Sequence, residues 1–306
     1  MYFPYFRGRQ YELLALRDVA QKNLISEKTI PIIEPVKRIP GLKNALAAFQ
    51  ASSLPVGLVV NPTVGDLIGH SDYIVDLLSE FGKESVVIPS VLMSNDTEDT
   101  LSMLERVDYN REDVIAFLDK REDIERYRSF FEGTPRFTLC TEKRNILRAV
   151  RANRVLFENR FNKKSRNADY PPDEEFSYDH LEYDEYGDFV GFGDYSIIGD
   201  EYVESGFAPY AVAIHIVYFA EDESLRIKHF VSDSNDDISD VAGKFYQAVT
   251  KLNNWYYGEG QERQLTTGLK ALLDHYSNKT YPGLPTLKKL SIMHHLELMD
   301  KYLTGR

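Results

Sequence analysis

Short apolar runs alternate with amphipathic segments along the first 160 residues of the chain. The runs have the length and composition of buried strands, and the segments between them repeat apolar positions every three or four residues, as helices do. Because single helices separate successive strands, the pattern predicts a parallel sheet with helical crossovers. The six predicted strands are 29–37, 55–62, 85–90, 113–119, 136–140 and 154–158. The predicted helices are 11–20, 42–49, 73–81, 97–107, 123–131 and 142–151.

Two further apolar runs, 189–193 and 211–218, bring the predicted strands to eight. Eight strands close a (β/α)8 barrel, which typically takes about 250 residues. We therefore expect an α/β fold with a (β/α)8 TIM-barrel-like domain over residues 1–235. The alternative is an open doubly wound sheet, but no Gly-x-Gly-x-x-Gly motif follows the first strand.

Residues 162–188 interrupt the repeat after the sixth strand with a basic head and an acidic, tyrosine-rich tail. A charge run is usually a solvated surface segment. Long loops in compact domains are also often lids or binding loops, so we expect an irregular insertion at the barrel rim. The run 225–231 alternates like one more strand, which we expect to pair outside the barrel or as a hairpin with 211–218.

Three helical segments, 238–255, 261–276 and 287–303, complete the pattern. Their apolar positions recur at three and four residues, so each has one face to bury. We expect residues 236–306 to form a C-terminal helical extension packed on the barrel.

Composition narrows the class of protein. The chain is 43% hydrophobic and 27% charged, which is ordinary for a globular protein, and no apolar run approaches the roughly 20 residues that cross a bilayer. Its start lacks the layout of a signal peptide, and Cys140 is its one cysteine, so we expect a cytoplasmic protein without disulfides and without membrane contact. The formal net charge of -12 argues against general nucleic-acid binding, although local basic patches stay open.

The stretch 188–200 joins an apolar strand pattern to glycines and polar side chains. Gly191, Gly193 and Gly199 allow close backbone approach or turns, and polar groups follow at the end of the strand. The plain interpretation is a bulged strand with a tight turn. The functional one is a reactive loop at the mouth of the barrel.

In a barrel, the carboxyl ends of the strands meet at one mouth, where active sites lie. Carboxylates recur at these ends, and gathered carboxylates suit general acid/base work or an oxygen-ligated divalent metal such as Mg²⁺ or Mn²⁺. The alternative is that they only cap the helices that follow. The candidate catalytic residues or ligands are Glu34, Asp119, Glu158, Asp194 and His215. The candidate substrate-binding residues are Asn61, Arg160, Tyr195 and Ser196.

Other reactive residue types favour structural interpretations. A lone histidine in an apolar strand, such as His215, is more often a hydrogen-bonded core residue than a ligand, and Cys140 is expected to be a buried small residue. His294 and His295 are adjacent and therefore point to different helix faces. The stretch 7–12 is either a structural ion-pair cluster, which base rates favour, or an element of the site. Neither a His-Glu-x-x-His motif nor a P-loop occurs in the sequence.

The elements Arg7-Gly-Arg-Gln10 and Ile32-Ile-Glu-Pro35, within the opening forty residues, resemble the beta protein family, a bacterial and phage group that takes its name from a phage T4 protein. The resemblance is best over these forty residues and runs through most of the chain. It implies a role in a bacterial phage-defence or mobile-element module, beside a second small protein encoded nearby. It brings no established catalytic residues.

Two functions follow as hypotheses. The first is a barrel protein of a phage-defence or mobile-element module, with a polar, metal-assisted or acid/base site at the strand ends. The second is a non-catalytic protein-binding scaffold, which grips a partner through loop 162–188 or the C-terminal helices. Tyrosines in that loop, at positions 170, 178, 183 and 186, motivate the second hypothesis, since tyrosine gives large contact area at low entropic cost.

Overall fold

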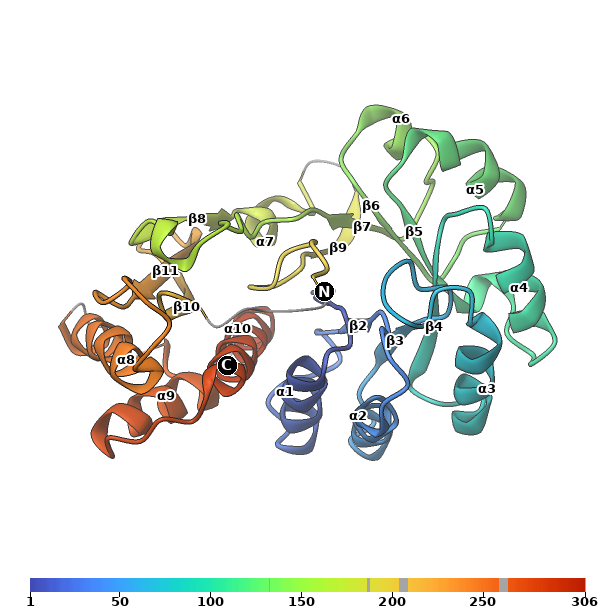
Figure 1. Cartoon of the computed structure of the whole chain (residues 1–306). Helices are drawn as coiled ribbons and strands as arrows, with labels where there is room; N and C mark the ends of the chain where they lie inside the picture. The colour runs from blue at the N-terminus through green and yellow to red at the C-terminus, as the bar shows by residue number, and fades with distance from the viewer. Residues whose placement is uncertain (132, 186–187, 204–208, 259–263, 306) are drawn as a thin grey trace. The chain divides into compact units, whose positions relative to one another are not determined.

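The computed structural model describes residues 1–131, 133–185, 188–203, 209–258 and 264–305. The chain packs into two compact units (Figure 1). The first comprises Met1–Asn159 and Asp179–Tyr195, and the second Arg160–Tyr178 and Ser196–Arg306. Among the described residues, no helix is long and apolar enough to cross a membrane.

The first unit is an eight-stranded parallel sheet in the order β1-β2-β3-β4-β5-β6-β7-β9. Its edges are joined by backbone hydrogen bonds from Phe3 N to Phe192 O and from Tyr5 N to Asp194 O, both 2.8 Å. The sheet therefore closes on itself, and the TIM-barrel-like prediction is confirmed. The strands are Tyr5–Phe6, Ile32–Ile33, Val56–Val59, Val87–Leu92, Ile115–Leu118, Phe137–Cys140, Arg154–Phe157 and Phe189–Gly193.

Helices connect the strands and cover the outside of the barrel (Figure 1). The first six form at the predicted amphipathic segments, where an apolar stripe turns inward; in the third helix the stripe includes Ile74 and Leu78, both fully buried. The helices are α1 Gln10–Gln21, α2 Pro40–Ala51, α3 Ser71–Phe81, α4 Thr97–Glu105, α5 Ile124–Phe130, α6 Arg144–Leu147 and α7 Asp179–Glu182. Short 3-10 turns, Arg111–Asp113 and Arg121–Asp123, flank β5.

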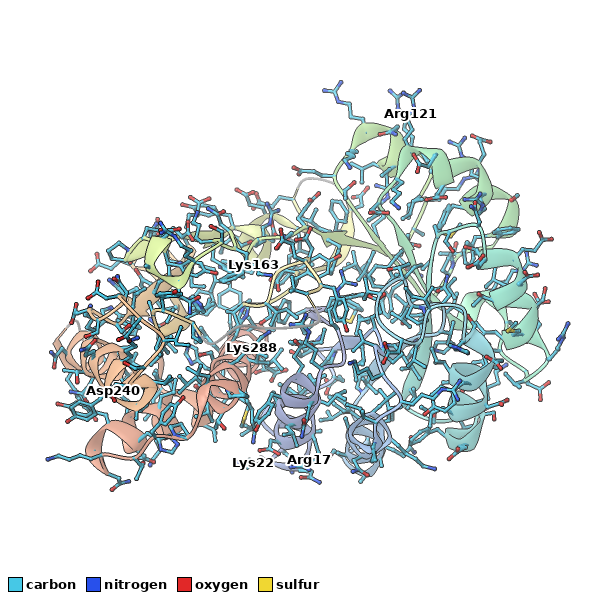
Figure 2. The ribbon with its side chains drawn as sticks, viewed as in Figure 1. Arg17, Lys22, Arg121, Lys163, Asp240 and Lys288 are labelled. Carbon is cyan, nitrogen blue, oxygen red and sulfur yellow. The ribbon has the colours of Figure 1, made fainter. Side chains whose placement is uncertain are left out.

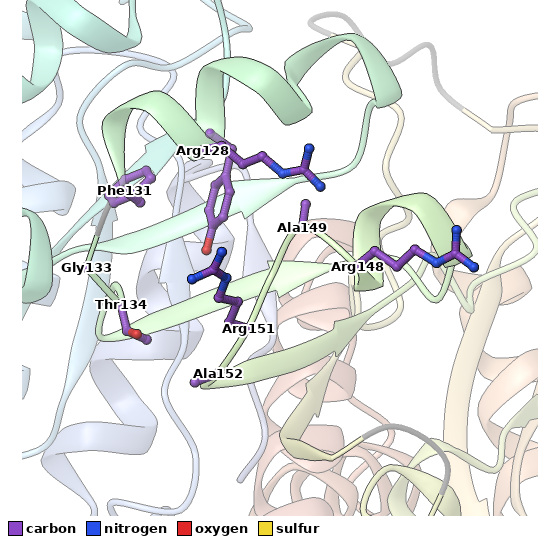
Figure 3. Close-up of a pocket in the computed structure, with 9 residues that line it drawn as sticks. Arg128, Phe131, Gly133, Thr134, Arg148, Ala149, Arg151 and Ala152 are labelled. Carbon is purple, nitrogen blue, oxygen red and sulfur yellow. The ribbon is translucent and has the colours of Figure 1, made fainter.

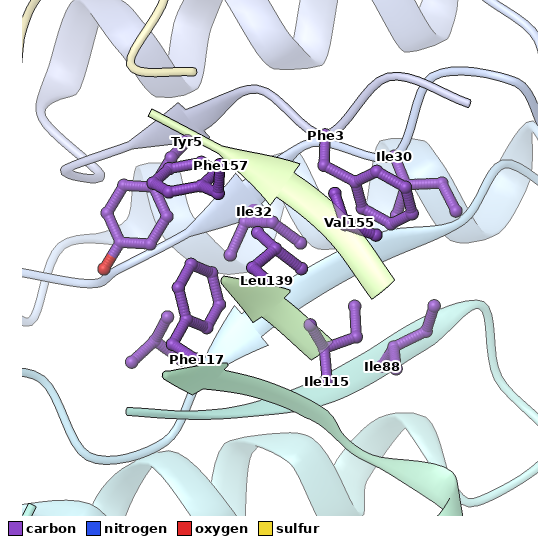
Figure 4. Close-up of a cluster of buried hydrophobic side chains, with 11 residues drawn as sticks. Phe3, Tyr5, Ile30, Ile32, Ile88, Ile115, Phe117, Leu139, Val155 and Phe157 are labelled. Atoms are coloured by element: carbon purple, nitrogen blue, oxygen red, sulfur yellow. The ribbon is translucent and has the colours of Figure 1, made fainter. Parts of the chain in front are cut away.

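Buried side chains from most of the strands form one cluster (Figure 4). It includes Phe3, Tyr5, Ile32, Phe117 and Phe157. Aromatic rings gather toward the carboxyl end, where Tyr5 lies edge-on to Phe117 with 5.3 Å between ring centroids. The interior of the barrel is thus filled by side chains, as is usual for eight-stranded barrels. The layer at the carboxyl end is aromatic.

Steric crowding explains why glycines occur in β9, within the stretch 188–200. A Cβ on Gly193 would lie 2.3 Å from Phe3 O, and one on Gly191 would lie 2.5 Å from Met1 O. Only a residue without a side chain lets β9 approach the first strand closely enough to close the barrel. The bulge prediction is confirmed as well, since the β7–β9 register shifts between Arg154 and Val155.

The second unit holds a three-stranded antiparallel sheet in the order β10-β11-β8. β10 (Ala213–Phe219) and β11 (Leu225–Val231) form a hairpin, and β8 (Asp173–Ser177) pairs with β11. Three helices pack with this hairpin or with one another: α8 Val241–Gly258, α9 Thr267–Ser277 and α10 Leu284–Thr304. The expected packing of these helices on the barrel stays a prediction.

Two expectations about this region are wrong. The run 211–218 is not the eighth barrel strand, because its residues pair with β11 in the second sheet. The barrel strand that was missed is Tyr5–Phe6, whose two residues are too short to show a periodicity. The insertion 162–188 is also not wholly irregular, since it contributes β8, α7 and the 3-10 turn Asn167–Asp169.

Candidate functional site at the barrel mouth

A buried ion pair joins the ends of the first two barrel strands. Tyr5 lies opposite Ile32 and Phe6 opposite Ile33 in the parallel register, so the residues that follow, Arg7 and Glu34, become neighbours. Arg7 Nη1 donates to Glu34 Oε2. The Glu34 side chain is fully buried, whereas 11% of the Arg7 side chain is exposed. The pair therefore lies at the mouth with only its cation reaching the surface.

Local backbone geometry turns the chain away directly after Arg7. Gly8 has a φ of 60°, and a Cβ there would lie 3.0 Å from Glu34 O. A side chain would thus meet both left-handed strain and the backbone of the neighbouring strand end. Gly8 lets the α1 segment leave the sheet while Arg7 stays over Glu34.

Both oxygens of Glu34 are occupied by donors. Tyr5 donates its hydroxyl to Oε2 at 2.6 Å, beside the Arg7 contact, and Thr63 donates its backbone N–H at 2.7 Å and its hydroxyl at 3.0 Å to Oε1. A buried carboxylate is tolerated only when it is paired and hydrogen-bonded, and here it is both. Burial, followed by the Glu34 charge, raises the pKa of Tyr5 well above its usual value, so Tyr5 stays a neutral donor.

The guanidinium of Arg7 lies among aromatic rings. Its central carbon is 5.3 Å from the ring centroid of Tyr5 and 5.6 Å from that of Tyr195. Tyr195 is half-buried and stands edge-on to Tyr5 at 5.2 Å and to Phe157 at 5.0 Å. These distances suit cation–π attraction, which contributes about 0.5–2 kcal/mol depending on desolvation. The mouth therefore presents a fixed cation beside a partly exposed ring.

The other predicted carboxylates occupy separate environments. Asp194 is buried and accepts the Tyr2 hydroxyl at 2.9 Å on the seam where the barrel closes. Asp119 is exposed, and Glu158 is half-buried with its backbone N–H 3.3 Å from Gly193 O. In the part of the chain that the structure describes, no three His, Cys, Asp or Glu residues gather as a group that could hold a metal ion.

Asn61, predicted to bind substrate, joins two strands. Its side-chain Nδ2 donates to Leu92 O at 2.8 Å, and its Oδ1 accepts from Leu92 N at 2.9 Å. Both ends of the amide are thus engaged with the backbone of β4. This contact continues the ladder beyond the end of β3, which is a structural role.

Three predicted site residues belong to the second unit. His215 lies in β10, so its expected position at the end of a barrel strand is wrong; its catalytic role stays a prediction. Ser196 is buried and its Oγ lies 2.9 Å from His295 Nδ1. Arg160 is half-buried at the start of this unit.

The cysteine and the adjacent histidines behave as expected. Cys140 is buried, and burial raises the pKa of its thiol to about 12, which rules out a ready thiolate at neutral pH. His294 and His295 are buried with different partners: His294 donates from Nε2 to Val217 O at 2.6 Å, and His295 contacts Ser196. The prediction that they serve different faces is confirmed.

A cavity of about 610 Å³ lies at the opposite end of β6 and β7, where the strands begin. It is lined by Arg128, Arg148 and Arg151, but their guanidinium groups lie apart from one another (Figure 3). Arg128 pairs with Glu125 at 2.9 Å. The arginines therefore do not converge on one anion, and the active sites of barrels lie at the other end, where the strands end.

Comparisons of the chain with family models, with curated proteins and with solved structures found no match. The resemblance of residues 1–36 to the beta protein family stays a prediction. Sequence reasoning named Glu34 but missed Tyr5 and Thr63 as its partners. The parallel register would have revealed the Arg7–Glu34 pair had Tyr5–Phe6 been recognised as a strand.

Proposed function

We propose that the protein acts in a bacterial phage-defence or mobile-element module, and that the cluster around Arg7 at the barrel mouth is its working site. In this proposal Arg7 recognises an anionic group, such as a carboxylate or phosphate, that enters beside Tyr195. A guanidinium suits this task because it is always charged and presents a planar fork of donors. Glu34 is a positioning residue that fixes the fork.

The proposal rests on which sequence elements supply the two residues of the ion pair. Arg7 comes from the element Arg7-Gly-Arg-Gln10 and Glu34 from Ile32-Ile-Glu-Pro35, the two elements on which the family resemblance rests. Replacing a buried ion pair by apolar residues is often neutral or stabilising, so stability alone is a weak reason to keep one. Its position at the carboxyl ends of barrel strands favours a functional reason.

The sequence also suggested Mg²⁺ or Mn²⁺ at the strand ends. An ion could reach Glu34 only by displacing the donors of Tyr5, Arg7 or Thr63. The same contacts argue against Glu34 as a general base, because its lone pairs are already committed. In the proposed site Arg7 therefore recognises the ligand, and no metal ion takes part.

A phage-challenge experiment tests the proposal. Cells carrying the gene with its neighbours are infected, and the efficiency of plating is compared for the natural protein and Arg7→Lys, which keeps the charge but loses the fork. Arg111→Lys is the matched control, since Arg111 is 41% exposed and pairs with Glu105 at the surface. We expect Arg7→Lys alone to lose protection at equal protein level. Equal protection by both variants would contradict the site.

A second candidate function, the protein-binding scaffold, is favoured by exposed tyrosines on the C-terminal helical segment. Tyr257 is 63% exposed, and Tyr246 and Tyr281 are each 38% exposed. The loop 162–188 is a poorer candidate than expected, because Tyr170 is buried and Tyr178 and Tyr183 are half-buried. Tyr186, the last tyrosine expected there, lies outside the described residues.

Capture of the co-expressed neighbouring gene product tests this second candidate. Tyr257→Ser and Tyr281→Ser should each reduce the recovered partner several-fold, because interface tyrosines carry a large share of binding energy. Tyr11→Ser on α1 of the barrel is the control. Unchanged recovery with both the Tyr257 and the Tyr281 variant would exclude this surface.

A further inference from the structure

Three charged or titratable side chains form a line across the second sheet. His215 on β10 and His229 on β11 are direct cross-strand partners, and Glu174 on β8 lies on the other side of β11. The two Nδ1 atoms of His215 and His229 are 2.7 Å apart, and His229 Nε2 is 3.1 Å from Glu174 Oε1. The strand order β10-β11-β8 therefore builds a continuous Glu–His–His chain.

Neighbouring side chains hold the Glu174–His229–His215 series in place. The ring of Tyr170 stacks on His229 with 4.6 Å between centroids and stands edge-on to His215 at 4.6 Å. Asn162 Nδ2 donates to the second oxygen of Glu174 at 3.2 Å. Lys288 and Lys164 add positive charge near His215 and His229 respectively, and Asp173 lies near His229. Burial lowers the pKa of His215 to about 3 and also lowers that of His229, so both rings are neutral at neutral pH.

Hydrogen-bond logic then fixes both tautomers. Glu174 can only accept, so His229 carries its proton on Nε2 and offers a lone pair at Nδ1. His215 must donate from Nδ1 to that lone pair, since two unprotonated nitrogens would repel at 2.7 Å. The remaining nitrogen of His215, Nε2, is consequently an acceptor. None of the described residues forms a hydrogen bond with it.

His215 lines a cavity of about 260 Å³ within this unit. Lys163 and Lys288, which Figure 2 labels, line the same cavity. Lys163 also pairs with Glu201 at 3.2 Å. Phe161, Ile198 and Leu287 supply apolar surface. The volume is roughly that of nine water molecules, which suits a small molecule. The lining thus combines cations, apolar walls and one acceptor of fixed direction.

We propose that this cavity binds a small molecule with an apolar body, an anionic group and a hydroxyl, in which the hydroxyl donates to His215 Nε2. The lysines attract the anion, and the apolar residues enclose the body. Glu174 and His229 act as positioning residues, because they hold His215 in the accepting tautomer. The site is independent of the barrel mouth, so failure of either proposal leaves the other standing.

Matched benzoates test the proposal by titration calorimetry. The probe is 3-hydroxybenzoate; 3-methoxybenzoate lacks the donor, and 3-hydroxybenzyl alcohol lacks the anion. We expect the natural protein to bind 3-hydroxybenzoate at least tenfold more tightly than either analogue, since each analogue leaves a polar group of the cavity unmatched. Equal binding of hydroxy and methoxy probes, equal binding of the alcohol, or no binding of any probe would overturn it.

Two variants separate recognition from folding. His215→Phe should abolish the hydroxy-over-methoxy preference, and Glu174→Ala should reduce it to within about threefold by releasing the tautomers. His275→Phe, on α9 and outside the cavity lining, is the control and should keep the preference. A merely structural role would alter both affinities together and leave their ratio unchanged.

Nitrogen NMR of the natural protein tests the tautomers even where a variant does not fold. Long-range proton–nitrogen spectra should show His215 protonated at Nδ1 and His229 at Nε2, with His215 Nε2 shifting on addition of 3-hydroxybenzoate. A proton on His215 Nε2 in the free protein would overturn the proposal.

Discussion

Arg7 and Glu34 form an ion pair because the parallel strands β1 and β2 end at the same level in the sheet. The register Phe6 opposite Ile33 places the next residue of each strand side by side, one a cation and the other an anion. Tyr5 and Thr63 complete the shell around the carboxylate. A two-residue strand thus supplies both a wall of the barrel and the charge at its mouth.

Breaking this pair should destabilise the barrel. We expect Arg7→Ala or Glu34→Ala to lower the free energy of unfolding by about 3–5 kcal/mol, since each leaves a buried partner uncompensated. The double variant should cost less than the sum of the two, because neither charge then remains. Lys43→Ala, which removes an ion pair exposed by more than half on both sides, is the control and should change it by about 0–1 kcal/mol. Urea unfolding measures all four, and additive costs would contradict coupling.

Gly193 should be needed for closure of the barrel. In Gly193→Ala the new methyl group would clash with Phe3 O, so the seam between β1 and β9 must open or shift. We expect a loss of about 1–3 kcal/mol in the free energy of unfolding, the range typical of overpacking. Gly258→Ala, where a Cβ meets nothing within 4 Å, is the matched control and should be neutral or slightly stabilising. A thermal midpoint for Gly193→Ala at or above the natural value would argue against the tight seam.

Asn61 should matter for stability rather than for ligand binding. Asn61→Ala leaves the N–H of Leu92 without its amide acceptor, whereas the Leu92 carbonyl keeps the Thr97 hydroxyl as a donor at 3.3 Å. The unmatched N–H costs about 1–3 kcal/mol, so the thermal midpoint should fall by several degrees. Protection in the phage assay should persist at permissive temperature. Loss of protection with an unchanged midpoint would restore Asn61 to the site.

Acid should destabilise the second unit through its buried histidines. Burial lowers the pKa of His294 to about 4 and that of His295 to about 3, below the value of about 6.5 in an unfolded chain. The unfolded chain therefore binds more protons as the pH falls, and stability that is present above about pH 6.5 is lost toward pH 4. His294→Gln should flatten this decline in urea unfolding, whereas exposed His70→Gln should not. A pH-independent free energy of unfolding between pH 7 and pH 4.5 would contradict the assignment.

The sequence revealed the fold better than the site, for physical reasons. Six β/α repeats and the strand 189–193 carry strong periodicity, so the barrel was predictable. The strand Tyr5–Phe6 carries none, and β10 looked like a barrel strand because the second sheet also buries apolar residues of that run, such as Ile214 and Ile216.

Site residues depend on register and tautomer, which local sequence does not encode. Glu34 was named from its place after an apolar run, yet its partner Arg7 depends on strand pairing 27 residues away. Asp119 and Asp194 follow equivalent strand ends, but one is exposed and the other bonds Tyr2. The contact between His215 and His229 appears only once β10 and β11 are known to pair antiparallel.

Recognition of an anion by Arg7 at the barrel mouth can be observed on the side-chain Nε–H signal of Arg7 in a proton–nitrogen NMR titration. Sodium acetate and sodium phosphate are compared with sodium chloride at equal ionic strength, and Arg7→Lys assigns the signal. We predict a saturable shift of the Arg7 signal with acetate or phosphate and none with chloride. An Arg7 signal that stays fixed while surface arginines such as Arg111 shift would show that the ion pair is structural only.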